Sequence, residues 1–301
     1  MRSLFRANNI PALIVCIVHM AVIYFVSLFA SQDPIISIFI AVGIYAVILV
    51  IAISPIGEFL CRICFGGRRI SVNDWQTKVD YALNNVIINA ENRNINIPNN
   101  IKVYYVYDVF PTSFSVGKSI CLSSALLDSN QQNIEACIAH EIGHITAYDS
   151  TITILANSGN MVVLALGALL QSFYVFNNWT SRYGRSRASG RRHLFAALLL
   201  GLPLIIVGIV LGVTRLILNI GNREKEYAAD MFAVNIGYGQ ALKNALLTMD
   251  FDSQLNRRNI WQSLVASHPG VYDRVGRIDS YLGDNSNVNY YSSNLLNELS
   301  R

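Results

Sequence analysis

The chain has 301 residues, of which 52% are hydrophobic and only 14% are charged. A soluble domain carries about 25% charged residues, so this composition is typical of a protein with segments inside a lipid bilayer. It excludes a disordered chain, a collagen-like fibre and a small disulfide scaffold, which need high charge, a Gly-X-Y repeat or dense cysteine.

Four apolar stretches lie in two pairs along the chain. Residues 10–30 and 34–53 form the first pair, residues 151–176 and 194–214 form the second, and none of the four contains Asp, Glu, Lys or Arg. About 20 apolar residues cross the hydrocarbon core as a helix, so each stretch is long enough to span a membrane. We therefore expect two hydrophobic helical hairpins.

Arginines beside these stretches predict how the chain lies in the membrane. Arg2 and Arg6 precede the first stretch, and Arg62, Arg68 and Arg69 follow the second. Because Lys and Arg collect on the cytoplasmic side, both flanks of the first hairpin are expected in the cytoplasm. Five further arginines separate the third and fourth stretches and would lie outside, against this rule, if the second hairpin crossed fully. Either this hairpin only enters the bilayer, or the folded segment before it overrides the rule and the hairpin spans.

The arginine-rich connection is interpreted as a solvated loop near lipid headgroups. A nucleic-acid site needs interleaved aromatic residues, and only Tyr183 lies among these arginines, so no nucleic-acid partner is expected. Cys61 and Cys64 have the spacing of redox or zinc sites but lack a second Cys or His pair nearby. Beside a membrane span, palmitoylation is the alternative, and two cysteines without a role is the interpretation we favour.

Secondary structure between the hairpins follows from periodicity. Apolar residues recur at helical spacing over 75–90, and β-branched and aromatic residues predict a strand over 101–107 and short strands over 113–117 and 119–122. Ser129 and Gln132 fit a capping box, with Ser129 as the N-cap of a helix that starts near residue 130.

That helix carries the sequence His140-Glu141-Ile142-Gly143-His144. Histidines four residues apart share one face of a helix, so their imidazoles can bind one Zn²⁺, while Glu141 can reach a water on the metal without binding the metal itself. Random placement of the chain's His and Glu residues predicts about 0.002 such pentads. The alternative is a half-buried helix whose histidines bond to backbone carbonyls.

A catalytic zinc needs a third protein ligand and one open position. Glu226 and Asp230 are four residues apart just beyond the fourth apolar stretch. Glu226 can bind the metal, and Asp230 can accept a hydrogen bond from a ligand histidine and fix its tautomer. Glu224 competes for the ligand role but lacks an acid four residues on. Without the histidine pair, these acids would be a solvated helix start.

Chain distances place the metal close to the bilayer. If helical, the segment from His144 to Thr151 is about 10 Å long and that from Thr214 to Glu226 about 18 Å long. Both ligand helices would then rise from the second hairpin at one membrane face. Substrates would be membrane proteins or segments leaving the membrane.

With these motifs the chain resembles the HtpX-type membrane zinc metalloproteases, which are related to the CAAX-prenyl-protease-type peptidases. The resemblance implies His140, His144 and Glu226 as zinc ligands, Glu141 as catalytic base and Asp230 as the acid behind a ligand. It implies one Zn²⁺ per chain.

The implied fold is a mainly α membrane protein with an α+β zincin-like catalytic domain built from two chain segments. The expected division is a flank and transmembrane hairpin (1–65), a first catalytic segment (66–150), a second hydrophobic hairpin (151–219) and a second catalytic segment (220–301).

Two further blocks match the family less fully. Phe114 and Gly117 fit a segment before the zinc helix, but Thr112 replaces the family's Asn, and an edge strand here can bind substrate or serve only the core. Ser267-His268-Pro269, followed by Arg274, resembles a C-terminal segment of the family. Two roles are open for His268: stabilising the oxyanion, or starting a helix before Pro269.

The implied activity is zinc-dependent peptide hydrolysis in the quality control of misfolded or membrane proteins. The resemblance implies the bacterial plasma membrane as the location, with the catalytic domain in the cytoplasm and polypeptides as substrates. In the implied mechanism, zinc activates a water and Glu141 moves its proton to the leaving amine. A site-2-type protease would carry the motif inside a span, and a CAAX-type protease has more spans. The non-enzymatic alternative is a multi-span scaffold with a structural metal site.

Overall fold

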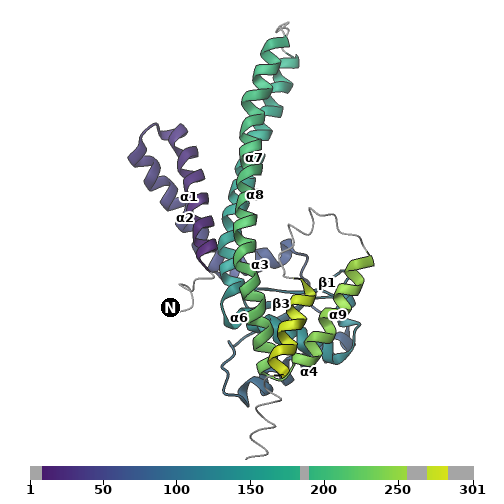
Figure 1. The fold of residues 1–301 in the computed structure, drawn as a ribbon. Helices are drawn as coiled ribbons and strands as arrows, with labels where there is room; N and C mark the ends of the chain where they lie inside the picture. Colours follow the sequence, from purple (N-terminus) through teal and green to yellow (C-terminus); the bar gives the residue numbers. More distant parts are fainter. Residues whose placement is uncertain (1–8, 184–189, 256–269, 284–301) are drawn as a thin grey trace, which may run out of the picture.

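The computed structural model describes residues 9–183, 190–255 and 270–283, and this part of the chain is mostly helical with one small sheet (Figure 1). The first helices are α1 (Ile10–Ser31), α2 (Pro34–Ile53), α3 (Pro55–Cys64) and α4 (Asn73–Glu91). The strands β1 (Lys102–Val106), β2 (Ser113–Val116) and β3 (Ser119–Ser123) follow. The later helices are α5 (Ser124–Leu127), α6 (Gln131–Thr146), α7 (Asp149–Tyr183), α8 (Gly190–Asn235) and α9 (Gly239–Leu255), and residues 271–283 are also helical.

The apolar helices stand apart from the α/β part of the molecule. Within the described residues, three stretches are long and apolar enough to cross a membrane: Ile10–Leu28 in α1, Pro34–Ile53 in α2 and Asp149–Leu169 in α7. The fourth predicted stretch, residues 194–214, lies within α8. Helices α7 and α8 pack side by side into a long rod (Figure 1). Helix α1 contacts both of them at the end of the rod that is nearer to the α/β part.

A buried polar contact joins three of these helices. His19 of α1 is fully buried, and its Nε2 lies 2.9 Å from Oδ1 of Asn160 in α7. The hydroxyl of Thr214 in α8 donates to the same oxygen at 3.1 Å. Polar side chains inside apolar helices commonly bond across helices in this way. Asn160 is therefore a packing contact between these helices.

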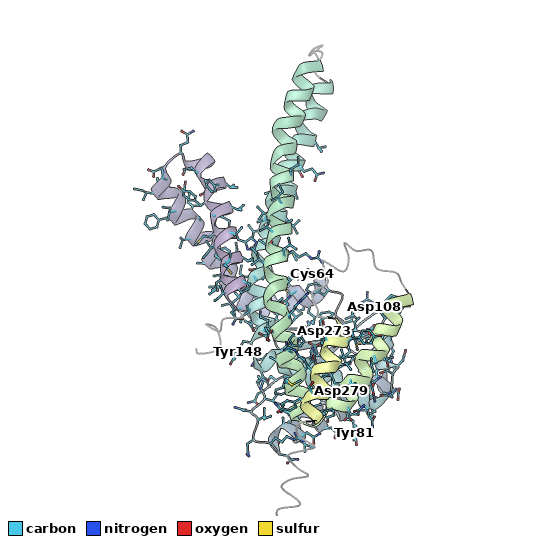
Figure 2. The ribbon with its side chains drawn as sticks, viewed as in Figure 1. Cys64, Tyr81, Asp108, Tyr148, Asp273 and Asp279 are labelled. Carbon is cyan, nitrogen blue, oxygen red and sulfur yellow. The ribbon has the colours of Figure 1, made fainter. Side chains whose placement is uncertain are left out.

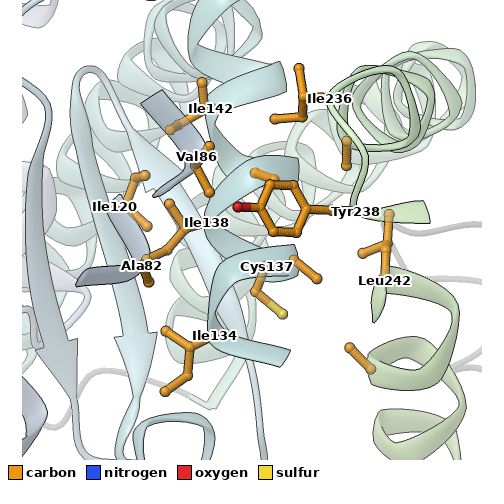
Figure 3. Close-up of a cluster of buried hydrophobic side chains, with 14 of the residues drawn as sticks. Ala82, Val86, Ile120, Ile134, Cys137, Ile138, Ile142, Ile236, Tyr238 and Leu242 are labelled. Carbon is orange, nitrogen blue, oxygen red and sulfur yellow. The ribbon is translucent and has the colours of Figure 1, made fainter. Parts of the chain in front are cut away.

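The core of the α/β part combines side chains from two segments that are far apart in sequence, residues 79–145 and 233–278. Figure 3 shows Val86 of α4, Ile120 of β3 and Ile138 of α6 meeting Ile236 and Tyr238, which follow α8. The helices α5 and α9 and the helical segment 271–283 add buried side chains to the same cluster. Burial of this shared apolar surface holds two segments together that are far apart in sequence.

The sheet has the strand order β1-β3-β2, with β1 parallel and β2 antiparallel to β3. Lys102 pairs with Ser119 in the first ladder, and Ser113 pairs with Leu122 in the second. All three predicted strands are confirmed within a residue or two. In the part of the chain that the structure describes, β2 pairs only with β3 and forms an edge of the sheet.

The start of α6 corrects the predicted cap. Asn130, not Ser129, is the N-cap, and its side-chain Oδ1 accepts a hydrogen bond from the amide of Asn133 at 2.8 Å. The hydroxyl of Ser129 instead donates to the carbonyl of Leu126 at 2.7 Å. Asn and Ser cap helices about equally well. Asn130 becomes the cap because the hydroxyl of Ser129 is already bonded to the carbonyl of Leu126 in α5.

The end of α6 corrects the assumed run of helix from His144 to Thr151. Helix α6 ends at Thr146, Tyr148 takes a left-handed conformation with φ of 63°, and α7 starts afresh at Asp149. A non-glycine residue at positive φ interrupts a helix, so α6 and α7 can point in different directions. By contrast, α8 runs without interruption from its apolar part to Glu226.

The cap assignment predicts different costs for two neighbouring substitutions. Asn130→Ala should destabilise the protein by about 1 kcal/mol, because the amide of Asn133 loses its acceptor. Ser129→Ala should cost clearly less. Chemical unfolding of the full chain in detergent, with hydrogen exchange at the Asn133 amide, measures both effects. A larger loss for Ser129→Ala would contradict the assignment.

Candidate metal centre

Helix α6 presents its two histidines away from its apolar face. Ile134, Ile138 and Ile142 are fully buried in the core. His140 and His144 lie four residues apart on a different face, and their Nε2 atoms are 3.2 Å from each other. The packing of α6 therefore fixes the direction in which the imidazoles point.

A glycine lets α8 approach this face. A Cβ atom on Gly143 would lie 3.0 Å from Cα of Ala229 and 3.1 Å from Cβ of Phe232. Real Cβ atoms rarely approach other atoms so closely, so the two helices reach this separation because residue 143 lacks a side chain. Ala229 is three residues after Glu226, so the contact brings Glu226 across to the histidines.

Three side chains converge on one point. Nε2 of His140 lies 3.4 Å from Oε2 of Glu226, and Nε2 of His144 lies 3.4 Å from Oε1 of the same carboxylate. Tetrahedral ligands at the usual Zn²⁺ bond lengths are about 3.3 Å apart. The three separations fit such a tetrahedron, and these residues form a group that could hold a metal ion.

Each histidine also has a carboxylate at its other nitrogen. Oδ1 of Asp230 lies 3.0 Å from Nδ1 of His140, and Oδ2 of Asp149 lies 3.4 Å from Nδ1 of His144. Such partners orient metal-binding histidines and set their tautomers. The first contact is the one that the sequence predicted. Sequence reasoning missed Asp149, although it is the first acid after the His144 motif.

Arg274, in the helical segment 271–283, contacts both acids that α8 contributes to the centre. Its guanidinium donates two hydrogen bonds to Asp230, at 2.6 and 2.8 Å, and lies 3.3 Å from Oε2 of Glu226. Burial alone would raise the pKa of Asp230, but its hydrogen bonds to Arg274 and His140 outweigh burial and lower that pKa. Arg274 was noted in the sequence only as part of a family block, and its place beside both acids was not foreseen.

Glu141 lies next to the group on the same helix. It is buried, and its Oε1 accepts a hydrogen bond from the hydroxyl of Ser113 at 2.7 Å. Ser113 begins the edge strand β2. The carboxylate is therefore held by the strand that borders the site.

Other predicted residues lie elsewhere. Glu224 is exposed, so of the two competing acids only Glu226 joins the group. Phe114 packs edge-on against Phe65 of the chain after α3. Cys61 and Cys64 are free cysteines on α3. His268 lies outside the described residues.

The centre carries an excess of negative charge. Among the described residues, the buried carboxylates outnumber the buried lysine and arginine by two, which is the charge that a divalent cation would neutralise. The carboxylates are those of Glu141, Asp149, Glu226 and Asp230, and the cations are Lys225 and Arg274. The residues present therefore fit a divalent metal in both spacing and charge.

The same carboxylates make the histidines basic when no metal is bound. Burial alone would lower the pKa of His144, but its contacts with Asp149 and Glu226 outweigh burial and raise that pKa to about 10. The pKa of His140 is also raised, because Asp230 and Glu226 outweigh its burial. In the absence of a metal, the carboxylates therefore favour the protonated form of both histidines, and a metal would have to displace those protons.

This basicity predicts proton release on metal binding. A ligand histidine must be neutral, so Zn²⁺ binding at pH 7 should release about one proton or more per chain. Calorimetry in two buffers of different ionisation enthalpy measures the number. Asp149→Asn should release fewer protons, because His144 loses an anionic partner. Equal release from both proteins would show that Asp149 does not set the basicity of His144.

Comparison with known proteins places these features in a family. Residues 81–282 match the model of peptidase family M48. The chain is 28% identical over 200 residues to a protease HtpX homolog of Thermoanaerobacter pseudethanolicus, covering 59% of this chain and 65% of the relative. It is 26% identical to a protease HtpX homolog of Tropheryma whipplei over 71% of this chain and 75% of the relative.

The match to the first of these relatives spans less than two thirds of its length. A crystal structure of Ste24p from S. mikatae aligns with a TM-score of 0.46 and 18% identity, over 86% of this chain and 61% of that one. The family match covers well over half of the residues, including both histidines, Glu226 and Arg274. The chain therefore belongs to peptidase family M48, a family of metalloproteases, as its resemblance to the HtpX proteins predicted.

Proposed function

We propose that the chain is a zinc-dependent endopeptidase integrated in a membrane, with His140, His144 and Glu226 as ligands of one Zn²⁺ per chain. The observation that carries this proposal is the mutual spacing of the three ligand atoms, 3.2 to 3.4 Å, which suits one tetrahedral metal. The negative charge of the surrounding buried residues supports the same conclusion. Three protein ligands leave a fourth position open, as a catalytic site requires.

Glu141 is proposed as the catalytic base. Bound Zn²⁺ would supply Lewis acidity to the substrate carbonyl and to the attacking water. Glu141 would accept the proton of that water and deliver it to the leaving amine. The hydrogen bond from Ser113 supports this role, because it holds one carboxylate oxygen still and leaves the other for proton transfer.

Two carboxylates are proposed to hold the ligands in place. Asp230 and Asp149 would each keep one histidine in the tautomer whose Nε2 faces the metal. Arg274 balances the charge of Asp230 and Glu226, so these acids can remain ionised in a buried site. His268 is proposed as a stabiliser of the oxyanion, and it precedes Arg274 in the chain by only a few residues.

Polypeptides are the proposed substrates, and membrane or misfolded proteins are the proposed class. The edge strand β2 lies beside Glu141 and offers its outer backbone to an extended peptide. Asp149, which contacts His144, begins the apolar stretch of α7, so the site lies at the membrane end of the α/β part. A segment leaving the bilayer would meet the site directly.

The proposed location is the plasma membrane, with the catalytic part in the cytoplasm. Arg68 and Arg69 are exposed just after the apolar α2 and the amphipathic α3, and such arginines favour the cytoplasmic side. The quality-control role follows from the resemblance to HtpX-type proteases, whose relatives match this chain over more than half its length.

The ligand assignment predicts a sharp difference between two nearby acids. Glu226→Gln should weaken Zn²⁺ binding by more than about 100-fold, because it removes a ligand rather than a residue behind a ligand. Glu224→Gln should leave binding unchanged, because Glu224 is exposed and outside the group. Competition with a zinc-sensitive dye measures both affinities. Similar losses in the two variants would rule out Glu226 as the ligand.

The role of Glu141 predicts a separation of metal binding from catalysis. Glu141→Gln should cut hydrolysis of an unfolded, casein-like substrate by about 10²- to 10⁴-fold while zinc stays near one per chain. A chelator should abolish the wild-type activity. If wild type and variant both hold zinc and cleave equally well, Glu141 is not the base. If both hold zinc and a panel of membrane and soluble substrates stays intact, the metal site is structural.

A further inference from the structure

Helix α3 is amphipathic, and its apolar face is uncovered. Ile56, Phe59, Leu60 and Ile63 recur at helical spacing along one side, and each is about half exposed or more. Phe65, directly after the helix, is 58% exposed as well. So much clustered apolar surface is unusual for a face that meets water.

The opposite side of α3 is bound to the α/β part. The carboxylate of Glu58, the only acid on the helix, accepts a hydrogen bond from the hydroxyl of Ser119 at the start of β3. The guanidinium of Arg62 lies 3.8 Å from the ring centre of Tyr104 in β1. Phe65 contacts Phe114 of the edge strand β2. The charged side chains of α3 therefore face the protein, and its apolar side chains at positions 56, 59, 60 and 63 face outward.

The chain turns sharply where α3 begins. Helix α2, which is apolar enough to cross a membrane, ends at Ile53, and α3 starts at Pro55 with the side chain of Ser54 as its cap. A Cβ atom on Gly57 would lie 2.4 Å from the carbonyl oxygen of Ile51. Only glycine can lie so close to the end of α2, so the sharp bend requires glycine at position 57. In Figure 1, α3 lies where the apolar helices meet the α/β part.

We propose that α3 lies in the interface of the bilayer, with its apolar face among the lipid chains next to the headgroups. The occupant of the face is lipid because α3 continues directly from a candidate membrane span and is too short to span by itself. Arg68 and Arg69 follow it and are exposed, so they would meet anionic headgroups. Amphipathic helices with basic flanks bind membranes in this way.

This placement would fix the active site relative to the membrane surface. The contacts of α3 reach β2 through Phe114 and the start of β3 through Ser119. Strand β2 carries Ser113, which holds Glu141. An interfacial α3 therefore ties the edge strand, and with it the catalytic base, to a set depth beside the bilayer.

Spin labels on the full chain in lipid nanodiscs test the proposal. Ile63→Cys is made in a background with Cys16→Ala, Cys61→Ser and Cys64→Ser, while the buried Cys121 and Cys137 remain. Tyr81→Cys in the same background is the matched control, because Tyr81 is 60% exposed at the end of the molecule remote from the apolar helices (Figure 2). Cys64, next to the test position, lies near those helices in the same view.

The nanodiscs contain phosphatidylcholine and phosphatidylglycerol, and power saturation compares access of oxygen with that of a water-soluble nickel complex. The expected result is a label at 63 that oxygen reaches more readily than nickel, and a label at 81 with the reverse preference. A label at 63 as open to nickel as the control would overturn the proposal. Zinc content and unfolding temperature of each variant show that it is folded.

Other occupants give other results, and each would also overturn the proposal. Protection from nickel that requires an added single-span peptide would assign the face to substrate. Dipolar broadening that disappears on dilution with unlabelled protein would assign it to a second copy of the chain. Neither readout depends on peptide hydrolysis, so an inactive enzyme with an immersed α3 would separate this proposal from the proposed function.

Discussion

The close contact between α6 and α8 is the constraint on which the site depends. Gly143 lets α8 lie against α6, and this approach brings Glu226 within 3.4 Å of both histidines. It also concentrates buried carboxylates around two imidazoles, which is costly in a medium of low dielectric unless positive charge is supplied. Arg274 supplies part of that charge, a proton on His144, whose pKa is raised to about 10, supplies more, and a divalent ion would replace that proton. The same buried carboxylates thus favour a bound metal and raise the basicity of the histidines.

Local patterns in the sequence predicted the elements that depend on near neighbours. The spacing of His140 and His144 fixes one helical face, and the pair Glu226 and Asp230 fixes another, so both could be read without a structure. The three short strands were foreseen because their β-branched and aromatic residues are clustered. Glu226 was favoured over Glu224 for the ligand role because only Glu226 has an acid four residues on, and the structure brings Glu226 beside both histidines.

The features that were missed depend on tertiary contacts. Asp149 reaches His144 because Tyr148 interrupts the helix with a positive φ. A tyrosine at position 148 does not predict such an interruption from sequence. Asn130 takes the cap because α5 occupies the hydroxyl of Ser129. Arg274 meets Asp230 across the shared core, a contact between residues far apart in sequence. In each case, tertiary contacts decide between alternatives that the local sequence leaves open.

The rod of α7 and α8 has a consequence for how the molecule sits in a membrane. Helix α7 has 35 residues, about 53 Å at 1.5 Å per residue, whereas the hydrocarbon core is only about 30 Å thick. Such an excess of length is accommodated by tilting or by projecting beyond the far headgroups. Because α8 is a single helix from its apolar part to Glu226, any tilt of α8 also turns the part of the helix that carries Glu226. If α7 and α8 cross the bilayer, a change in its thickness would therefore act through α8 on the position of Glu226 relative to the two histidines.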